Sequence, residues 1–256
     1  MFSRAVVCSP SSNFAEGLTS RSLGPPVYPQ ALKQHEAYCA ALEQCGLKLV
    51  RLEADERYPD STFLEDAAVI TERGAILALP GAPSRIGEVA GVREALAQFY
   101  STLSSIHNPG TLDGGDICEV GNHFFIGISD RTNEIGAQQF AEWLASLDYT
   151  SSFVDIRDVK GILHLKSGLA YLDDNRLVVI DALSNRAEFR AYDLIVVNKQ
   201  EEYAANCVLV NEHVLVAAGH PELQKRLSEL GYQTIALEMS EFQKMDGGLS
   251  CLSLRF

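Results

Sequence analysis

"GGDICEVGNHFFIGIS", residues 114–129, contains a short apolar run, a turn at Gly121-Asn122 and a second apolar run. Gly and Asn readily adopt the backbone angles of tight turns, so two strand-like runs joined in this way predict a β-hairpin. Residues 61–81, 164–181 and 204–219 have the same shape, with Gly, Asn or Asp at each turn. The sequence therefore predicts that one hairpin unit is repeated along the chain.

The end of the chain, "GGLSCLSLRF" (247–256), carries only one apolar run, and the N-terminal "SRAVVCSP" (3–10) is a candidate partner strand for it. Between the hairpins, apolar residues recur at helical spacing. The four predicted helices cover residues 28–46, 84–100, 133–147 and 220–232. Gly46 is typical of a helix C-terminus, and Pro221 is typical of a helix start.

Comparable positions of the five units lie 40 to 51 residues apart: Glu65, Asp116, Ser167, Cys207 and Cys251. A repeated unit of two strands and a helix predicts a ring of blades around an axis. We therefore expect an α/β fold in which five ββαβ-type blades form a single domain, residues 1–256, around a polar channel. The repeat is one of pattern, because the units share few identical residues.

The composition excludes several classes of partner. The chain has 256 residues and a formal net charge of −13, whereas phosphate binding needs clustered Lys and Arg, so we expect no nucleic-acid partner. No apolar run approaches the roughly 20 residues that cross a bilayer, and the N-terminus lacks a secretory signal pattern. We expect a cytoplasmic protein without a membrane partner. Its acidity favours cationic ligands, although acidity also serves solubility alone.

The six cysteines form no CxxC pair and have no His-rich partner run, so the sequence predicts neither a zinc site nor any other metal site. A chain of this length without an export signal needs no disulfide framework. Most of the cysteines are expected to be reduced, buried and inert. A cysteine with a chemical role must be distinguished by its surroundings.

Several polar residues interrupt the apolar runs, where an unpaired charge is costly unless it binds a cation. These residues are Glu65, Asp66, Asp113, Asp116, His164, Lys166 and Cys251. Four of them also have a structural interpretation: Asp116 as a turn cap, Lys166 as a salt-bridge partner, His164 as a core histidine, and Cys251 as a small buried hydrophobe. By themselves the residues predict a pocket with cysteine, histidine and acids, and leave their roles open.

The order of longer motifs resembles that of the dimethylarginine dimethylaminohydrolases, which belong to the guanidine-modifying superfamily of five-bladed β/α propellers. The matching stretches are "GLTS" (17–20), "PDSTFLEDAAVI" (59–70), "LPGAPSRIGE" (79–88), "TLDGGDI" (111–117), "RTN" (131–133), "LHLKSGLAYL" (163–172), "YAANC" (203–207) and "KMDGGLSCLSLRF" (244–256). The last is similar to the ending of bacterial members, in which the cysteine is the nucleophile.

The resemblance implies hydrolysis of Nω,Nω-dimethyl-L-arginine, or of the monomethyl compound, to L-citrulline and dimethylamine or methylamine. Cys251 would form a covalent thiouronium intermediate, and His164 would act as general acid and then as general base. Asp113, together with Asp66, would hold the guanidinium by charge-assisted hydrogen bonds. Some bacterial members carry Glu at the position of Asp113, whose shorter side chain keeps the charge but shifts its position. No cofactor is implied.

The resemblance also implies binding sites for the amino-acid end of this small cationic guanidino amino acid. It matches Arg85 and Arg131 to the α-carboxylate, Asp60 and the backbone carbonyls of Leu18 and Met245 to the α-amino group, and Glu65 to a further substrate contact. The segment "GLTSRSLGPP" (17–26) is typical of a lid that excludes water. A homodimer is a further expectation.

Two alternatives stay open. The first is an arginine or other small-guanidine deiminase or amidinohydrolase on the same fold, although arginine deiminases usually carry an extra helical domain for which this chain has no room. The second is a non-catalytic binding protein. The presence of Cys251, His164, Asp66 and Asp113 argues against the second, because a binding protein needs no nucleophile.

Overall fold

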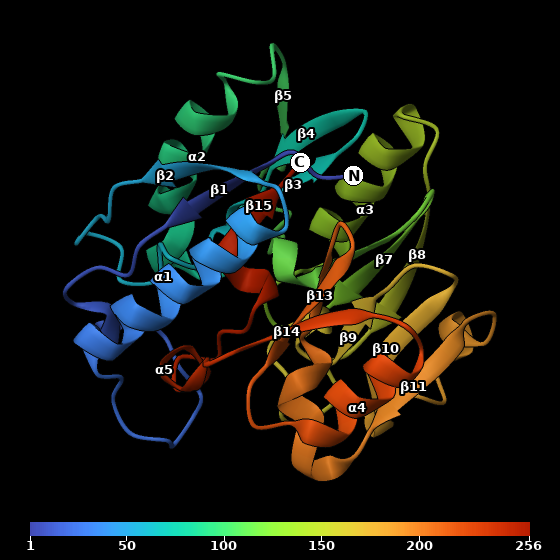
Figure 1. Cartoon of the computed structure of the whole chain (residues 1–256). Helices are drawn as coiled ribbons and strands as arrows, with labels where there is room; N and C mark the ends of the chain where they lie inside the picture. The colour runs from blue at the N-terminus through green and yellow to red at the C-terminus, as the bar shows by residue number, and fades with distance from the viewer.

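The computed structural model describes all 256 residues, which form five three-stranded sheets arranged around a central axis (Figure 1). The sheets have the strand orders β15-β1-β2, β3-β4-β5, β6-β7-β8, β9-β10-β11 and β12-β13-β14. Because each sheet uses strands that are consecutive in the chain, apart from the exchange at the termini, each is one blade. The predicted five-bladed β/α propeller is confirmed.

The strands and helices have the following bounds. The strands are β1 Arg4–Cys8, β2 Lys48–Leu52, β3 Ala68–Thr71, β4 Gly74–Leu77, β5 Leu103–Ser105, β6 Ile117–Val120, β7 His123–Ile128, β8 Thr150–Asp155, β9 Leu169–Tyr171, β10 Arg176–Ile180, β11 Asp193–Val197, β12 Val208–Val210, β13 His213–Ala217, β14 Gln233–Leu237 and β15 Ser253–Arg255. The helices are α1 Tyr28–Gln44, α2 Val89–Leu96, α3 Glu134–Ser146, α4 Pro221–Glu229 and α5 Ser240–Gln243.

Every blade has the same pairing. In the blade that contains residues 114–129, β6 pairs antiparallel with β7 across the two-residue turn Gly121-Asn122, and β7 pairs parallel with β8. A parallel pair needs a crossover connection, and α3 supplies it here. Between β10 and β11 short 3₁₀ turns replace the crossover helix, which agrees with the absence of a helical pattern in that part of the sequence.

The two ends of the chain share one blade. β1 pairs antiparallel with β15, with Val6 opposite Leu254, and parallel with β2. Figure 1 shows the N- and C-termini next to each other beside this sheet. The predicted partnership between the N-terminal and C-terminal runs is confirmed, and it closes the ring without an unpaired strand at the junction.

The apolar core is divided into four clusters of buried side chains between neighbouring blades and helices. All six cysteines are free, and Cys251 is the one that is not fully buried. No helix combines the length and the apolar character that a membrane crossing would need.

The axis is lined by 3₁₀ turns that come just before the first strand of each hairpin. These turns are Leu64–Ala67, Gly114–Asp116, Leu165–Ser167, Lys199–Ala205 and Ser250–Leu252. Four of the five neighbouring pairs of turns pack against each other, and Asn206, directly after Lys199–Ala205, links that turn to Ser250 by a hydrogen bond. Polar residues that are far apart in the sequence are thereby brought to one place.

Candidate active site

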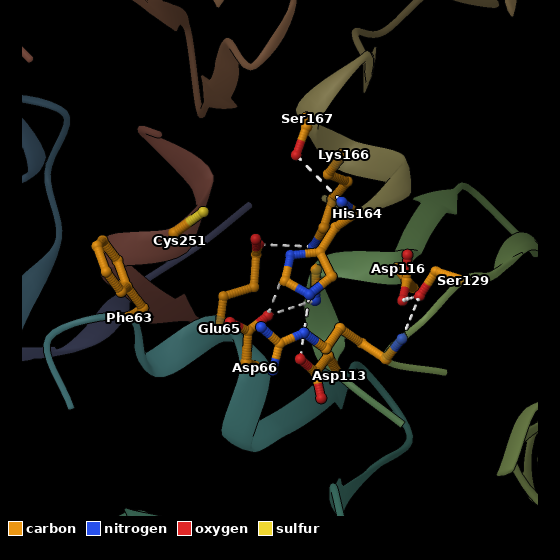
Figure 2. Close-up of polar contacts among 12 residues, drawn as sticks. Phe63, Glu65, Asp66, Asp113, Asp116, Ser129, His164, Lys166, Ser167 and Cys251 are labelled. Carbon is orange, nitrogen blue, oxygen red and sulfur yellow. Dashed lines mark hydrogen bonds and ion pairs between the residues drawn. The ribbon is translucent and has the colours of Figure 1, made fainter. Parts of the chain in front are cut away.

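A cavity of about 200 Å³ lies at the axis beside these turns. Nine of the ten predicted site residues line it: Leu18, Asp60, Asp66, Arg85, Asp113, Arg131, His164, Met245 and Cys251. Figure 2 shows that the side chains of Cys251, His164, Asp66 and Asp113 reach this region from separate parts of the ring. Glu65 is the tenth predicted residue, and it does not line the cavity.

His164 is held between two carboxylates. Its Nε2 lies 3.1 Å from Oδ2 of Asp113, and its Nδ1 lies 3.9 Å from Oδ1 of Asp66. Burial by itself lowers the pKa of His164, but the charge of Asp66 and the hydrogen bond to Asp113 outweigh burial and raise the pKa to about 9. The imidazole therefore carries a proton at neutral pH, and this proton is available to a leaving group.

The two carboxylates are themselves fixed by hydrogen bonds. Oδ1 of Asp66 accepts from the backbone N–H of Gly115 at 3.0 Å, and Oδ1 of Asp113 accepts from the N–H of Gly81 at 2.8 Å. Burial raises the pKa of Asp66, but His164 and Arg85 together lower it below its ordinary value, so this group is ionised. A Cβ at Gly115 would lie 2.7 Å from Nδ1 of His164 and 2.8 Å from Oδ1 of Asp66, so the close approach requires glycine here.

Cys251 lies in the 3₁₀ turn Ser250–Leu252, directly before β15. Burial raises the pKa of its thiol to about 12, and the negative charges of Glu65 and Asp66 add to this effect. The sulfur is therefore a neutral thiol while the cavity holds no cationic ligand. A cationic ligand beside it would favour the thiolate.

The turn that carries Cys251 is fixed by Asn206. The side-chain oxygen of Asn206 accepts from the N–H of Ser250 at 3.0 Å, and its nitrogen donates to Oγ of Ser250 at 2.9 Å and to the carbonyl of Lys166 at 2.7 Å. A Cβ at Gly248 would lie 2.4 Å from Oδ1 of Asn206. Glycine at position 248 is thus required for the close contact between two blades.

Glu65 differs from the expectation of a substrate contact. Its Oε1 accepts from Nζ of Lys166 at 2.6 Å, and its Oε2 accepts from Oγ of Ser250 at 2.6 Å. The residue is 4% exposed, and its carboxylate is engaged outside the cavity, where it supports the turn of the cysteine. Lys166 is a salt-bridge partner, as the sequence predicted.

Asp116 has the structural role that its sequence context favoured. It is fully buried and accepts hydrogen bonds from the hydroxyls of Ser129 and Thr132 and from the N–H of Leu165. Burial raises the pKa of Asp116 to about 6, although these hydrogen bonds and His164 oppose the rise. The bond to Leu165 fixes the backbone directly after His164.

The two predicted carboxylate-binding arginines differ in their availability. Arg85 is buried, donates to Asp66 at 2.6 Å and to Glu88 at 2.8 Å, and also donates to two backbone carbonyls. The side chain of Arg131, which is only partly buried, makes no hydrogen bond or ion pair within the protein. Arg131 is therefore the free cation of the cavity, whereas Arg85 is mostly committed to its acidic neighbours.

The lid segment, residues 17–26, is attached by two acids. Both oxygens of Asp60 lie 3.1 Å from the backbone nitrogen of Leu18. The carboxylate of Asp246 accepts from Oγ of Ser20 at 3.0 Å and from Nε of Arg21 at 2.8 Å. Asp246 was not predicted, although an acid directly before Gly-Gly in the C-terminal motif was a signal that could have indicated it.

One group of ligand atoms in the cavity has a spacing that a metal ion could use. The atoms belong to Asp66, Asp113 and His164 and lie within 4.8 Å of one another. In the structure His164 is hydrogen-bonded to Asp113, and Asp66 is paired with Arg85. These contacts engage the three groups with each other and with a guanidinium, so the cluster is a hydrogen-bond network.

A five-bladed β/α propeller with a cysteine, a histidine and carboxylates at its axis is the arrangement of the guanidine-modifying enzymes. No family model matches the sequence. The chain is 43% identical, over the full length of both proteins, to the N(G),N(G)-dimethylarginine dimethylaminohydrolase of Pseudomonas aeruginosa. It is 34% identical to the enzyme of the same name from Streptomyces coelicolor, over 98% of this chain and 96% of the relative. The chain belongs to the dimethylarginine dimethylaminohydrolase family.

Solved structures agree with this assignment. A cysteine-to-serine mutant of the Pseudomonas aeruginosa enzyme, complexed with citrulline, has a TM-score of 0.97 and 42% identity over all of both chains. A histidine-to-glycine variant of a dimethylarginine dimethylaminohydrolase, as an adduct with S-methyl-L-thiocitrulline, gives the same values. The N-terminal domain of ArgZ, a cyanobacterial arginine dihydrolase, is 20% identical with a TM-score of 0.88 over 98% of this chain and 96% of that chain, and shares the fold.

Proposed function

We propose that this protein is a single-domain hydrolase that converts Nω,Nω-dimethyl-L-arginine and Nω-monomethyl-L-arginine to L-citrulline and dimethylamine or methylamine. The observation that carries the proposal is the cavity in which Cys251 and the His164–Asp113 pair meet the carboxylate of Asp66. The full-length relatives of the same family support it. The substrate class is a small cationic guanidino amino acid.

The first half of the reaction forms a bond between carbon and sulfur. Carboxylates at Asp66 and Asp113 each keep unoccupied acceptor positions for a planar guanidinium. The bound cation lowers the pKa of the Cys251 thiol, which is raised in the free protein, and the thiolate then attacks the guanidinium carbon. His164 gives its proton to the methylated nitrogen, the C–N bond breaks, and the amine leaves as a neutral molecule.

The second half returns the protein to its starting state. Neutral His164 takes a proton from a water molecule, whose oxygen attacks the carbon of the thiouronium. The C–S bond breaks and Cys251 leaves as thiolate, while the carbon keeps the new oxygen. The remaining proton of that oxygen passes to the thiolate, which gives the urea group of citrulline and restores the neutral thiol. The hydrogen bond from His164 to Asp113 supports both steps, because it fixes the ring and stabilises the protonated form.

At the other end of the substrate, the free guanidinium of Arg131 supports a role in binding the α-carboxylate. Asp60 and the backbone carbonyls of Leu18 and Met245, which line the same cavity, are suited to the α-ammonium group. We assign Arg85 mainly to holding Asp66, since most of its donors are used within the protein.

Replacement of Arg131 by Ala is therefore expected to raise KM by roughly 10- to 150-fold, the equivalent of one lost charged hydrogen bond, and to leave kcat close to the parent value. Arg85→Ala should lower kcat as well, because it leaves Asp66 and Glu88 buried without their partner. Steady-state kinetics of both variants tests the distinction. Equal effects of the two variants on kcat, or an unchanged KM in Arg131→Ala, would contradict these assignments.

The second candidate function is an arginine or small-guanidine deiminase, which the fold shared with ArgZ allows. One assay separates the possibilities: citrulline formation from dimethylarginine and monomethylarginine, citrulline formation from arginine, and hydrolysis of agmatine. We expect turnover of the methylated substrates. Turnover of arginine alone would select the deiminase, and absence of turnover with all four would select a binding protein. Action in the cytoplasm and assembly as a homodimer stay predictions.

A further inference from the structure

Cys251 lines two cavities. Besides the substrate cavity described above, a second cavity of about 230 Å³ reaches the same cysteine. The two cavities share Leu163, Asp246, Gly247 and Cys251, and no other lining residues. Asp66, Asp113 and His164 line the substrate cavity alone, so the second cavity meets the nucleophile from a side that the reaction scheme has not used.

The lid segment, residues 17–26, lies between the two cavities. Thr19 and Ser20 line the substrate cavity, whereas Arg21, the next residue, lines the second cavity. Nε of Arg21 donates to Asp246 at 2.8 Å, and Nη2 donates to the carbonyl of Gly161 at 3.1 Å. With the lid in this position, Arg21 spans the gap between the C-terminal segment and the loop before His164 and separates the two spaces.

The two cavities have opposite charge. The substrate cavity contains four carboxylates, on Asp60, Asp66, Asp113 and Asp246, against two arginines and the protonated His164. The second cavity contains three cations, on Arg21, Lys160 and Lys199, against Glu202 and the shared Asp246. A guanidinium substrate is therefore attracted to the first cavity and disfavoured in the second.

The reaction needs an exchange of small molecules between its two halves. After the C–N bond breaks, the amine must leave and a water molecule must reach the same carbon, while the amino-acid part stays attached to Cys251 under the lid. The substrate cavity is then occupied by that amino-acid part, because about 200 Å³ leaves little room beside it. A passage on the other side of the sulfur removes this conflict.

We propose that the second cavity is the passage through which the released amine leaves and the hydrolytic water enters while the lid is closed. This inference rests on the proposed function. Its ligands are water and small neutral alkylamines. The amine is released neutral, so the basic lining does not hinder its entry into the passage. Once it takes a proton from solvent, the resulting ammonium is repelled by the same cations, which favours its departure over a return to the intermediate.

Two positions in the lining allow the passage to be filled without changing the catalytic groups. Lys160 and Gln200 are exposed, and neither side chain makes a hydrogen bond or ion pair in the structure. The test compares two double variants. The first carries Lys160→Trp together with Gln200→Trp and adds bulk to the lining. The second carries Lys160→Ala together with Gln200→Ala and removes the same charge and amide without adding bulk. Thermal unfolding verifies that both fold.

The proposal predicts that the tryptophan variant loses at least about tenfold in kcat, lowers KM in parallel, and accumulates a covalent adduct on Cys251 during turnover of dimethylarginine. Mass spectrometry of the quenched protein detects the adduct, and the alanine variant should retain the parent kcat. Parent-like turnover of the tryptophan variant without an adduct would overturn the proposal. So would a loss of kcat without an adduct, because exchange would then not be the impaired step. If the parent itself forms no citrulline, the proposed function fails first.

Discussion

Replacement of Cys251 by Ser is expected to lower citrulline formation by about 10⁴-fold or more, while the substrate still binds. The reason is that a hydroxyl ionises far less readily than a thiol, and a bound cation cannot lower its pKa enough to supply a nucleophile near neutral pH. The proposed guanidinium contacts at Asp66 and Asp113 are unaffected by the substitution, so calorimetry should detect dimethylarginine binding. A cysteine-to-serine mutant of the Pseudomonas aeruginosa relative, complexed with citrulline, agrees with retained binding.

Chemical labelling tests the choice of cysteine independently. A reactive amidine should modify Cys251 alone in the parent protein, because a cation bound in the cavity favours the thiolate of this cysteine, whereas the other five cysteines are buried and do not line the cavity. Cys45→Ala, at the end of α1 and outside the cavity, is the matched control and should keep the parent turnover. Labelling of Cys118 or Cys207 with loss of activity would show that the nucleophile is another cysteine.

Replacement of His164 by Gly should cut turnover of dimethylarginine by a factor on the order of 10² to 10⁴, because the variant has no general acid for the amine and no general base for the water. The side chain lies at the polar axis and outside the apolar clusters, so the fold should persist. Circular dichroism and thermal unfolding verify this. His107→Gly, in an exposed loop, is the matched control and should retain parent activity.

The same variant should behave differently with S-methyl-L-thiocitrulline, whose methanethiolate departs without a proton. The first half of the reaction should recover, and the protein should then stop as a covalent adduct on Cys251, since hydrolysis still needs the base. Mass spectrometry of the quenched variant measures the adduct. A histidine-to-glycine variant of a relative forms an adduct with this compound. A variant that unfolds, or that turns over both substrates as the parent does, would make His164 a structural residue.

Local sequence pattern was sufficient for the architecture. The turn at Gly121-Asn122 and its three counterparts predicted the hairpins, and the helical spacing in residues 28–46, 133–147 and 220–232 predicted α1, α3 and α4. Of the predicted helix 84–100, only Val89–Leu96 is α-helical, and the 3₁₀ turn Pro83–Glu88 precedes it. These hairpins and helices depend on residues within a few positions of one another, so the sequence of one segment is sufficient to predict them. The unpaired run at the C-terminus predicted even the closure with β1.

Residue type and family motif also predicted which side chains meet at the axis, but not what each of them contacts. Cys251, His164, Asp66 and Asp113 were identified from the sequence, and four separate parts of the ring bring them to one cavity. Their charge states could not be predicted. The pKa of His164 near 9 depends on two carboxylates whose distances are set by the packing of the turns.

Only the tertiary structure distinguished groups of identical chemistry. Arg85 is occupied by Asp66 and Glu88, whereas Arg131 is free, and no local pattern separates the two. Glu65 turns to Lys166 and Ser250, which are 101 and 185 residues away, and so does not line the substrate cavity. The second cavity at Cys251 likewise exists only where residues 21, 160–163 and 246–248 meet. Such contacts depend on the relative positions of whole blades, and the sequence of one segment does not contain those positions.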